Sequence, residues 1–163
     1  MKRKLTIISI LLLGLILSGC QTAVTTTYYL GAKADPKEVV NLSAEQVEQQ
    51  RWQDLYVTVD YSYTHQGNQF DIDGLFSFSD SAKINFSNVR RFKLHLFLLD
   101  QNMRVVDYRE VVRALGYSVE NQETFNDTFV LAENIVAFTF GYEGVLSDEG
   151  LSHAIWKLPR QNP

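Results

Sequence analysis

The chain has 163 residues, which allows one domain with a single hydrophobic core and leaves no room for two. Its formal net charge is −4, but Lys2, Arg3 and Lys4 lie in the first nineteen residues, where there is no acidic residue. The remaining chain has 12 basic and 19 acidic residues, a net charge of about −7. Because such a charge repels nucleic acid and anionic lipid, it argues against a nucleic-acid-binding protein.

The N-terminus has the parts of a secretory signal in the usual order. A short basic start is followed by an apolar run from Leu5 to Leu17. This run is too short to cross about 30 Å of hydrocarbon as a helix, which takes roughly 20 residues. We therefore predict that residues 1–19 are a cleaved signal peptide.

The motif Leu17-Ser18-Gly19-Cys20 follows the apolar run directly. It resembles the bacterial lipobox, in which Leu, a small residue, and Gly or Ala precede Cys. The resemblance implies cleavage before Cys20, diacylglycerol on its sulfur and a further acyl chain on its new amine. Several acyl chains anchor a protein stably, whereas one binds only marginally. Since Cys20 is the only cysteine, no intramolecular disulfide can form.

Gln21 follows the lipobox cysteine. In enterobacterial lipoproteins an Asp at this position resembles an inner-membrane retention signal. Gln21 therefore favours the outer membrane, on its periplasmic face, if the source is Gram-negative. We expect residues 20–42, rich in Thr and Ala, to be a lipidated tether and residues 43–163 to form the domain. A first edge strand at Tyr28 and Tyr29 is the alternative.

The composition of the domain favours strands, because aromatic and β-branched residues fit a pleated surface. Ten Phe and eight Tyr accompany only two Met. Ser43-Ala44-Glu45-Gln46 is typical of a capping box and predicts one short helix from Ala44 to about Trp52. The rest predicts an all-β antiparallel sandwich. Over about residues 53–146 the pattern resembles the immunoglobulin-like or transthyretin-like sandwiches of small envelope lipoproteins.

The clearest local pattern lies between Leu55 and Ser79, where two alternating runs are joined by Gly67-Asn68. This predicts a hairpin with a two-residue primed turn. One face is then wholly apolar, and a slip of one residue would destroy that arrangement. The predicted apolar pairs are Val57 with Phe78, Val59 with Phe76, Tyr61 with Gly74, and Tyr63 with Ile72.

A second hairpin is predicted after Val89, with a loop of Asp100-Gln101-Asn102 and Asn102 in the left-handed region. Between Tyr108 and Gly116 the pattern fits either a helical turn or an irregular strand. Further strands are predicted from Phe125 to Leu131 and from Ile135 to Val145. The predicted pairs of the second hairpin are Leu94 with Tyr108, Leu96 with Val106, Phe97 with Val105, and Leu99 with Met103.

Four residues of this second hairpin would form an apolar patch on its outer side: Phe97, Leu99, Met103 and Val105. A contiguous exposed apolar patch often marks a contact surface. Two alternatives follow. Either the chain covers the patch, with the tail Ala154–Leu158 or the predicted helix, or the patch is a site for another envelope protein.

No pattern of catalytic residues is present, and we expect no cofactor and no metal. His65, His95 and His153 are far apart and lack a metal-ligand spacing. Asp71 and Asp73 share the polar face of the first hairpin and are the best oxygen ligands for Ca²⁺, but a flat strand face rarely supplies six ligands. The expected function is a non-enzymatic, lipid-anchored binding or scaffolding module of the cell envelope. The alternative is a cell-surface module that binds a ligand or glycan.

Overall fold

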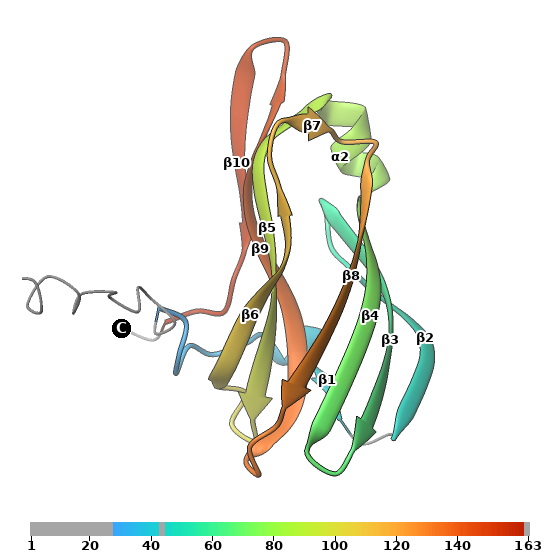
Figure 1. Ribbon diagram of the computed structural model, residues 1–163. Helices are drawn as coiled ribbons and strands as arrows, with labels where there is room; N and C mark the ends of the chain where they lie inside the picture. Colours follow the sequence, from blue (N-terminus) through green and yellow to red (C-terminus); the bar gives the residue numbers. More distant parts are fainter. Residues whose placement is uncertain (1–27, 43–44, 162–163) are drawn as a thin grey trace, which may run out of the picture.

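The computed structural model describes residues 28–42 and 45–161. Two antiparallel β-sheets face each other across one core, and there is little helix (Figure 1). The prediction of an all-β chain folded into antiparallel sheets is therefore confirmed.

The two sheets differ in size. The larger has the order β1-β9-β5-β6, with β10 paired to β9 and β7 paired to β5, while the smaller has the order β2-β3-β4-β8. The strands of the larger sheet are β1 Val40–Asn41, β5 Asn88–Asp100, β6 Val105–Ala114, β7 Tyr117–Ser118, β9 Ile135–Asp148 and β10 Leu151–Lys157. Those of the smaller sheet are β2 Gln46–Gln53, β3 Val57–Gln66, β4 Gln69–Phe78 and β8 Gln122–Val130. The helical elements are the 3-10 helix η1 Pro36–Glu38 and the α-helix α2 Asp80–Asn85.

Aromatic side chains from both sheets fill the space between them. The ring of Tyr61 on β3 lies 5.7 Å from that of Phe138 and 5.4 Å from that of Phe140, both on β9. Phe76 of β4 stacks on Phe92 of β5 at 4.7 Å. Alternate side chains of a strand point to one face, so the apolar positions of facing strands meet in a single core.

The first hairpin has the predicted register. β3 and β4 pair without a break from Val57 opposite Phe78 to Gln66 opposite Gln69. Gly67 has a φ of 60°, the conformation that the first turn residue of a type II′ hairpin requires. The predicted hairpin is confirmed, including its turn.

The second hairpin exists as β5 and β6, but its predicted register is wrong. Phe97 lies opposite Tyr108 and not Val105, while Leu96 lies opposite Arg109 and not Val106. Two irregularities shift the pairing, between Leu94 and His95 and between Leu98 and Leu99. Since both faces of this hairpin are apolar near the turn, the pattern does not select one register.

The turn of this hairpin differs from the prediction as well. The positive φ falls on Met103, at 60°, and not on Asn102. One carboxylate oxygen of Asp100 accepts the backbone N–H groups of Asn102 and Arg104 at 2.8 and 2.9 Å. This side-chain cap closes a longer loop than the three residues we expected.

The predicted helix over Ala44–Trp52 is wrong, because residues 46–53 form strand β2 on the edge of the smaller sheet. Trp52 is 5% exposed, and its ring lies 5.9 Å from that of Phe140. A helix this short is marginal in water, whereas the strand gains a ladder of hydrogen bonds with β3 and buries an indole.

The segment with an ambiguous pattern, residues 108–116, contributes to strand β6, which runs to Ala114. The two strands predicted after it are present as β8 and β9.

Residues 28–34, called the crossing segment from here on, lie on the outer side of the larger sheet (Figure 1). Val105 holds one side of the segment: its carbonyl accepts from Gly31 at 2.8 Å, and its N–H donates to Ala32 at 2.9 Å. On the other side, Lys33 and Arg160 exchange both backbone hydrogen bonds at 2.7 and 2.9 Å. These bonds hold the segment between the β5–β6 turn and the C-terminal residues.

The folded domain therefore begins earlier than residue 43. Residues 28–42, which the sequence assigns to the tether, pack as the crossing segment, helix η1 and strand β1. Tyr28 and Tyr29 lie in a turn and not in an edge strand. Residues 20–27, the remainder of the predicted tether, lie outside the described residues.

Candidate functional site

The predicted apolar patch is covered by the chain itself. Phe97 and Leu99 are fully buried and Val105 is 3% exposed, while Met103 is partly exposed. The cover is the crossing segment, with Leu158 from the tail. An exposed partner site at these residues, one of the two alternatives, is therefore wrong. Burial of these apolar side chains stabilises the fold. The residues of the crossing segment that make the cover are Tyr29, Ala32 and Ala34.

Tyr29 is the main side chain of this cover. Its ring contacts those of Phe97 and Tyr108 edge-on, at 5.3 and 4.9 Å. Burial raises the pKa of Tyr29 to about 12, and the charge of Glu143 adds to the rise. The phenol is therefore neutral at physiological pH, as a residue that seals an apolar cluster needs to be.

His95 lies beside this cover and is 5% exposed. Its ring lies 5.7 Å from Tyr29 and 5.8 Å from Phe97. Within the described part of the chain, neither of its ring nitrogens has a hydrogen-bond partner. Burial lowers the pKa of His95, while the carboxylates of Glu110 and Glu143 act against that shift. The other two histidines are far from it, so no histidine cluster forms.

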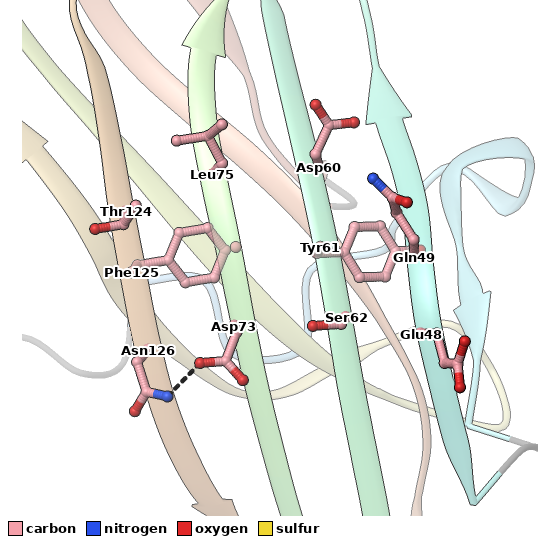
Figure 2. Close-up of a pocket in the computed structure, with 11 residues that line it drawn as sticks. Glu48, Gln49, Asp60, Tyr61, Ser62, Asp73, Leu75, Thr124, Phe125 and Asn126 are labelled. Atoms are coloured by element: carbon pink, nitrogen blue, oxygen red, sulfur yellow. Dashed lines mark hydrogen bonds between the residues drawn. The ribbon is translucent and has the colours of Figure 1, made fainter.

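The outer side of the smaller sheet, called the open face from here on, has a hollow of about 630 Å³ (Figure 2). The hollow lies over the backbone of Gly74, between the outward side chains of neighbouring positions. The Cβ position of Gly74 faces the core, like its partner Tyr61, and the buried Phe125 ring fills the space there: a Cβ on Gly74 would lie 2.2 Å from the tip of that ring. Asp60 and Asp73 line the hollow, with Ser62. The open face is thus polar and concave around one glycine.

The carboxylates of the open face are held by neighbouring side chains. The guanidinium of Arg51 donates to both oxygens of Asp60, at 2.6 and 2.9 Å. The Asn126 amide donates to Asp73, as Figure 2 shows. Each of these bonds crosses between adjacent strands, so the acidic groups are fixed in position.

Asp71 and Asp73, the pair that we considered for Ca²⁺, are not brought together with a third ligand. Asp71 accepts the Thr128 hydroxyl at 2.6 Å and the Gln69 amide at 2.7 Å, which lowers the pKa of its carboxyl. Residues 28–42 and 45–161 contain no group of three or more His, Cys, Asp or Glu able to hold a metal ion.

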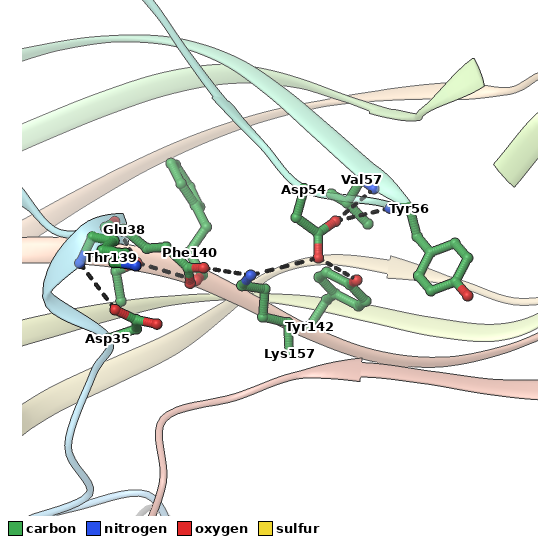
Figure 3. Close-up of polar contacts among 10 residues, drawn as sticks. Asp35, Glu38, Asp54, Tyr56, Val57, Thr139, Phe140, Tyr142 and Lys157 are labelled. Atoms are coloured by element: carbon green, nitrogen blue, oxygen red, sulfur yellow. Dashed lines mark hydrogen bonds and ion pairs between the residues drawn. The ribbon is translucent and has the colours of Figure 1, made fainter. Parts of the chain in front are cut away.

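A carboxylate network that the sequence analysis missed joins the two sheets at one edge (Figure 3). Asp54, in the turn between β2 and β3, accepts the backbone N–H groups of Tyr56 and Val57 at 2.9 and 3.0 Å. Its other oxygen accepts the Tyr142 hydroxyl at 2.7 Å and lies 3.9 Å from the Lys157 ammonium. Burial raises the pKa of Tyr142, and the bond to Asp54 adds to the rise.

This network holds the Asp54 carboxylate with three hydrogen bonds and one ion pair. Lys157 also pairs with Glu38 of helix η1. The carboxylate therefore links β9 and β10 of one sheet to the β2–β3 turn of the other. Nothing in the sequence pattern marks Asp54, because its partners Tyr142 and Lys157 are about 90 and 100 residues away.

The two sheets carry different charges. The strands of the smaller sheet contain six acidic residues and one basic residue. The strands of the larger sheet contain five acidic and six basic residues. The negative charge of the protein is thus concentrated on the side of the open face.

The outer side of the larger sheet has two hollows of its own, one of them beside the crossing segment. One, of about 580 Å³, is lined by residues that include Lys33, Trp156 and Arg160. The other, of about 500 Å³, includes Arg91 and again Trp156. The Trp156 side chain is 69% exposed, in contrast to the buried Trp52. The exposed indole of Trp156, among charged side chains of both signs, is the second site-like feature of the described residues.

Cys20, the predicted lipidation site, lies outside the described residues. Along the chain from residue 28 to 161, apart from residues 43–44, no helix combines the length and the apolar character needed to cross a bilayer.

Comparison with known proteins adds no relative. The sequence matches no protein-family model, no curated protein and no solved structure.

Proposed function

We propose that this chain is a non-enzymatic, lipid-anchored protein of the bacterial cell envelope, which binds or scaffolds another envelope component. The motif Leu17-Ser18-Gly19-Cys20 supports the anchor, and Gln21 supports the outer membrane of a Gram-negative cell, on its periplasmic side. The two packed antiparallel sheets support an immunoglobulin-like or transthyretin-like sandwich as the finer description of the fold.

The open face is the surface that we assign to the partner. The observation that carries this assignment is the hollow around Gly74, which is bordered by carboxylates held in fixed positions. Charged groups that are already ordered lose little conformational freedom when a partner binds. The partner surface that fits is basic and convex.

The anchor and the open face have complementary roles in this proposal. Restriction to a membrane raises the effective concentration of a weak binding surface near a partner in the same membrane or layer. The acidic charge of the open face speeds encounter with a basic partner and repels acidic ones. Weak contacts therefore suffice for a specific complex.

The proposal is tested by photo-crosslinking in the native cell, with a photoreactive amino acid in place of Thr124 at the rim of the hollow. The matched control carries the same group at Ile84 on α2, which is 82% exposed. We expect one discrete adduct with an envelope protein from position 124 and none from position 84. Identical adduct patterns from both positions would contradict the assignment.

Charge reversal gives a second readout. Asp73→Lys on the open face is expected to abolish the adduct, whereas Asp107→Lys, the same change at an exposed position of β6, is expected to leave it. A glycan in place of a protein adduct would favour the alternative, a ligand-binding or glycan-binding module.

A further inference from the structure

We infer that the outer side of the larger sheet, around the crossing segment, rests on the phospholipid bilayer that holds the acyl chains of Cys20. This inference rests on the proposed anchor, and it assigns an orientation to the domain that the anchor alone does not give. The crossing segment faces the headgroups, and the open face points away from the membrane.

The chain between the proposed anchor and the fold is short. Seven residues lie between Cys20 and Tyr28, so the two are eight residue steps apart. Even fully extended, that stretch spans at most about 28 Å, so Tyr28 lies within that distance of the acylated cysteine. Since the crossing segment lies on the larger sheet, this side of the domain is the one that the anchor brings to the membrane (Figure 1).

Large apolar side chains are exposed on the outer side of the larger sheet. Tyr28 is 66% exposed, Leu30 is 42% exposed and Trp156 is 69% exposed. Tyr and Trp are the residues enriched at membrane–water interfaces, because each has an apolar ring and a polar tip. Tyr28 and Leu30 belong to the crossing segment, and Trp156 shares a hollow with Lys33 of that segment. The backbone carbonyl of Tyr28 also accepts the side-chain amide of Gln161.

The charges around the crossing segment also favour contact with an anionic membrane. Lys33, Arg104 and Arg160 are exposed around the crossing segment. The Arg104 guanidinium donates to the carbonyl of Gly31 at 3.0 Å, and within the described ranges none of the three cations has a carboxylate within ion-pair distance. Each such cation near an anionic membrane surface contributes about 1 kcal/mol of attraction. Three exposed cations without a carboxylate partner among the described residues thus lie on the side of the domain that the anchor serves.

The acidic open face completes the orientation. An anionic bilayer repels the six acidic residues carried by the strands of the smaller sheet. Attraction of the cations near the crossing segment and repulsion of the acidic open face favour the same orientation of the domain. The binding surface of the proposed function is then presented to the aqueous compartment.

The test uses the acylated protein purified from its membrane and reconstituted into vesicles of phosphatidylcholine and phosphatidylglycerol. Because Cys20 is the only cysteine and is blocked by acylation, a cysteine introduced elsewhere is the only free thiol. An environment-sensitive fluorophore is attached at Leu30→Cys and, as the matched control, at Val130→Cys on strand β8 of the smaller sheet, which is 77% exposed.

The expected result is a blue shift of the emission at position 30 and its loss in vesicles that contain brominated lipid, with neither effect at position 130. Lys33→Glu combined with Arg160→Glu is expected to reduce the loss of emission at position 30. Equal quenching at both positions, or quenching at position 130 alone, would overturn the orientation while the anchor stands. Protein that carries no acyl mass and does not float with the vesicles would overturn the proposed anchor, and the orientation with it.

Discussion

The two outer sides of this protein show how one strand pattern leads to two different surfaces. On β3 and β4 the outward positions are mostly polar, as at Asp60 and Ser62, and water solvates them. On β5 the outward positions Phe97 and Leu99 are apolar, and the crossing segment covers them. Both sheets alternate with a period of two, but only one of them needs a second layer.

The difference shows that an N-terminal segment has become part of the core. Seven residues that look like linker in the sequence close an apolar cluster on the outer side of the larger sheet. The opposite side remains uncovered, and it is the surface that we propose for a partner. The predictions below test this contrast between the covered and the open side.

The largest effect is expected for Phe97→Ala on the covered side. Truncation of a fully buried phenylalanine removes contacts with Tyr29 and Tyr108 and leaves a cavity. We expect a loss of about 3–5 kcal/mol in the free energy of unfolding, measured by urea denaturation. The control Ser62→Ala on the open face is expected to stay within about 0.5 kcal/mol of the parent. Similar losses for both variants would contradict the contrast.

A smaller effect is expected for Gly74→Ala, on the core side of the sheet beneath the hollow of the open face. Its new Cβ would lie 2.2 Å from the Phe125 ring, which must move. Overpacking of this kind costs about 1–3 kcal/mol in the free energy of unfolding. The double variant with Phe125→Leu removes the clash, so the added cost of Gly74→Ala is expected to shrink in that background. A cost that stays the same there would show that Phe125 is not its cause.

The smallest effect is expected from the pH, through His95. Burial lowers the pKa of His95 in the folded protein, so the unfolded chain binds more protons once the pH falls below about 6.5. The stability contributed by the neutral ring is present above that pH and is lost as the pH falls through the folded pKa. Glu110 and Glu143 face the ring and oppose the effect, whereas Lys93 and Arg113 strengthen it.

The measurement is the urea midpoint of the parent and of His95→Leu, between about pH 7.5 and 5.5, a range above the ordinary pKa of carboxylates. The parent is expected to lose stability toward the acidic end more steeply than the variant. Parallel curves would mean that His95 is not buried as a neutral ring.

The first hairpin was predictable from sequence because two independent signals agree there. The Gly67-Asn68 turn and the alternating pattern both require Val57 to face Phe78. The second hairpin lacks this agreement, since Phe97 and Leu96 are both apolar although they face opposite sides. Shifting its register therefore leaves the pattern almost unchanged, and the irregularities at Leu94 and Leu98 are invisible in it.

The candidate site was less predictable, because its contacts join distant parts of the chain. Asp54 meets Tyr142, and Tyr29 covers Phe97, across separations that no local spacing records. The strand at residues 46–53 exists because the free edge of β3 pairs with it, and its helix-like start is overruled by that pairing. The polar character of the open face, in contrast, follows directly from the alternation.

The proposed anchor is tested most directly by intact-mass and peptide mass spectrometry of the protein isolated from its membrane. The account predicts a mature chain that begins at Cys20, with diacylglycerol on its sulfur and an acyl group on its amine. An unmodified Cys20, or a mature chain that begins at another residue, would contradict it.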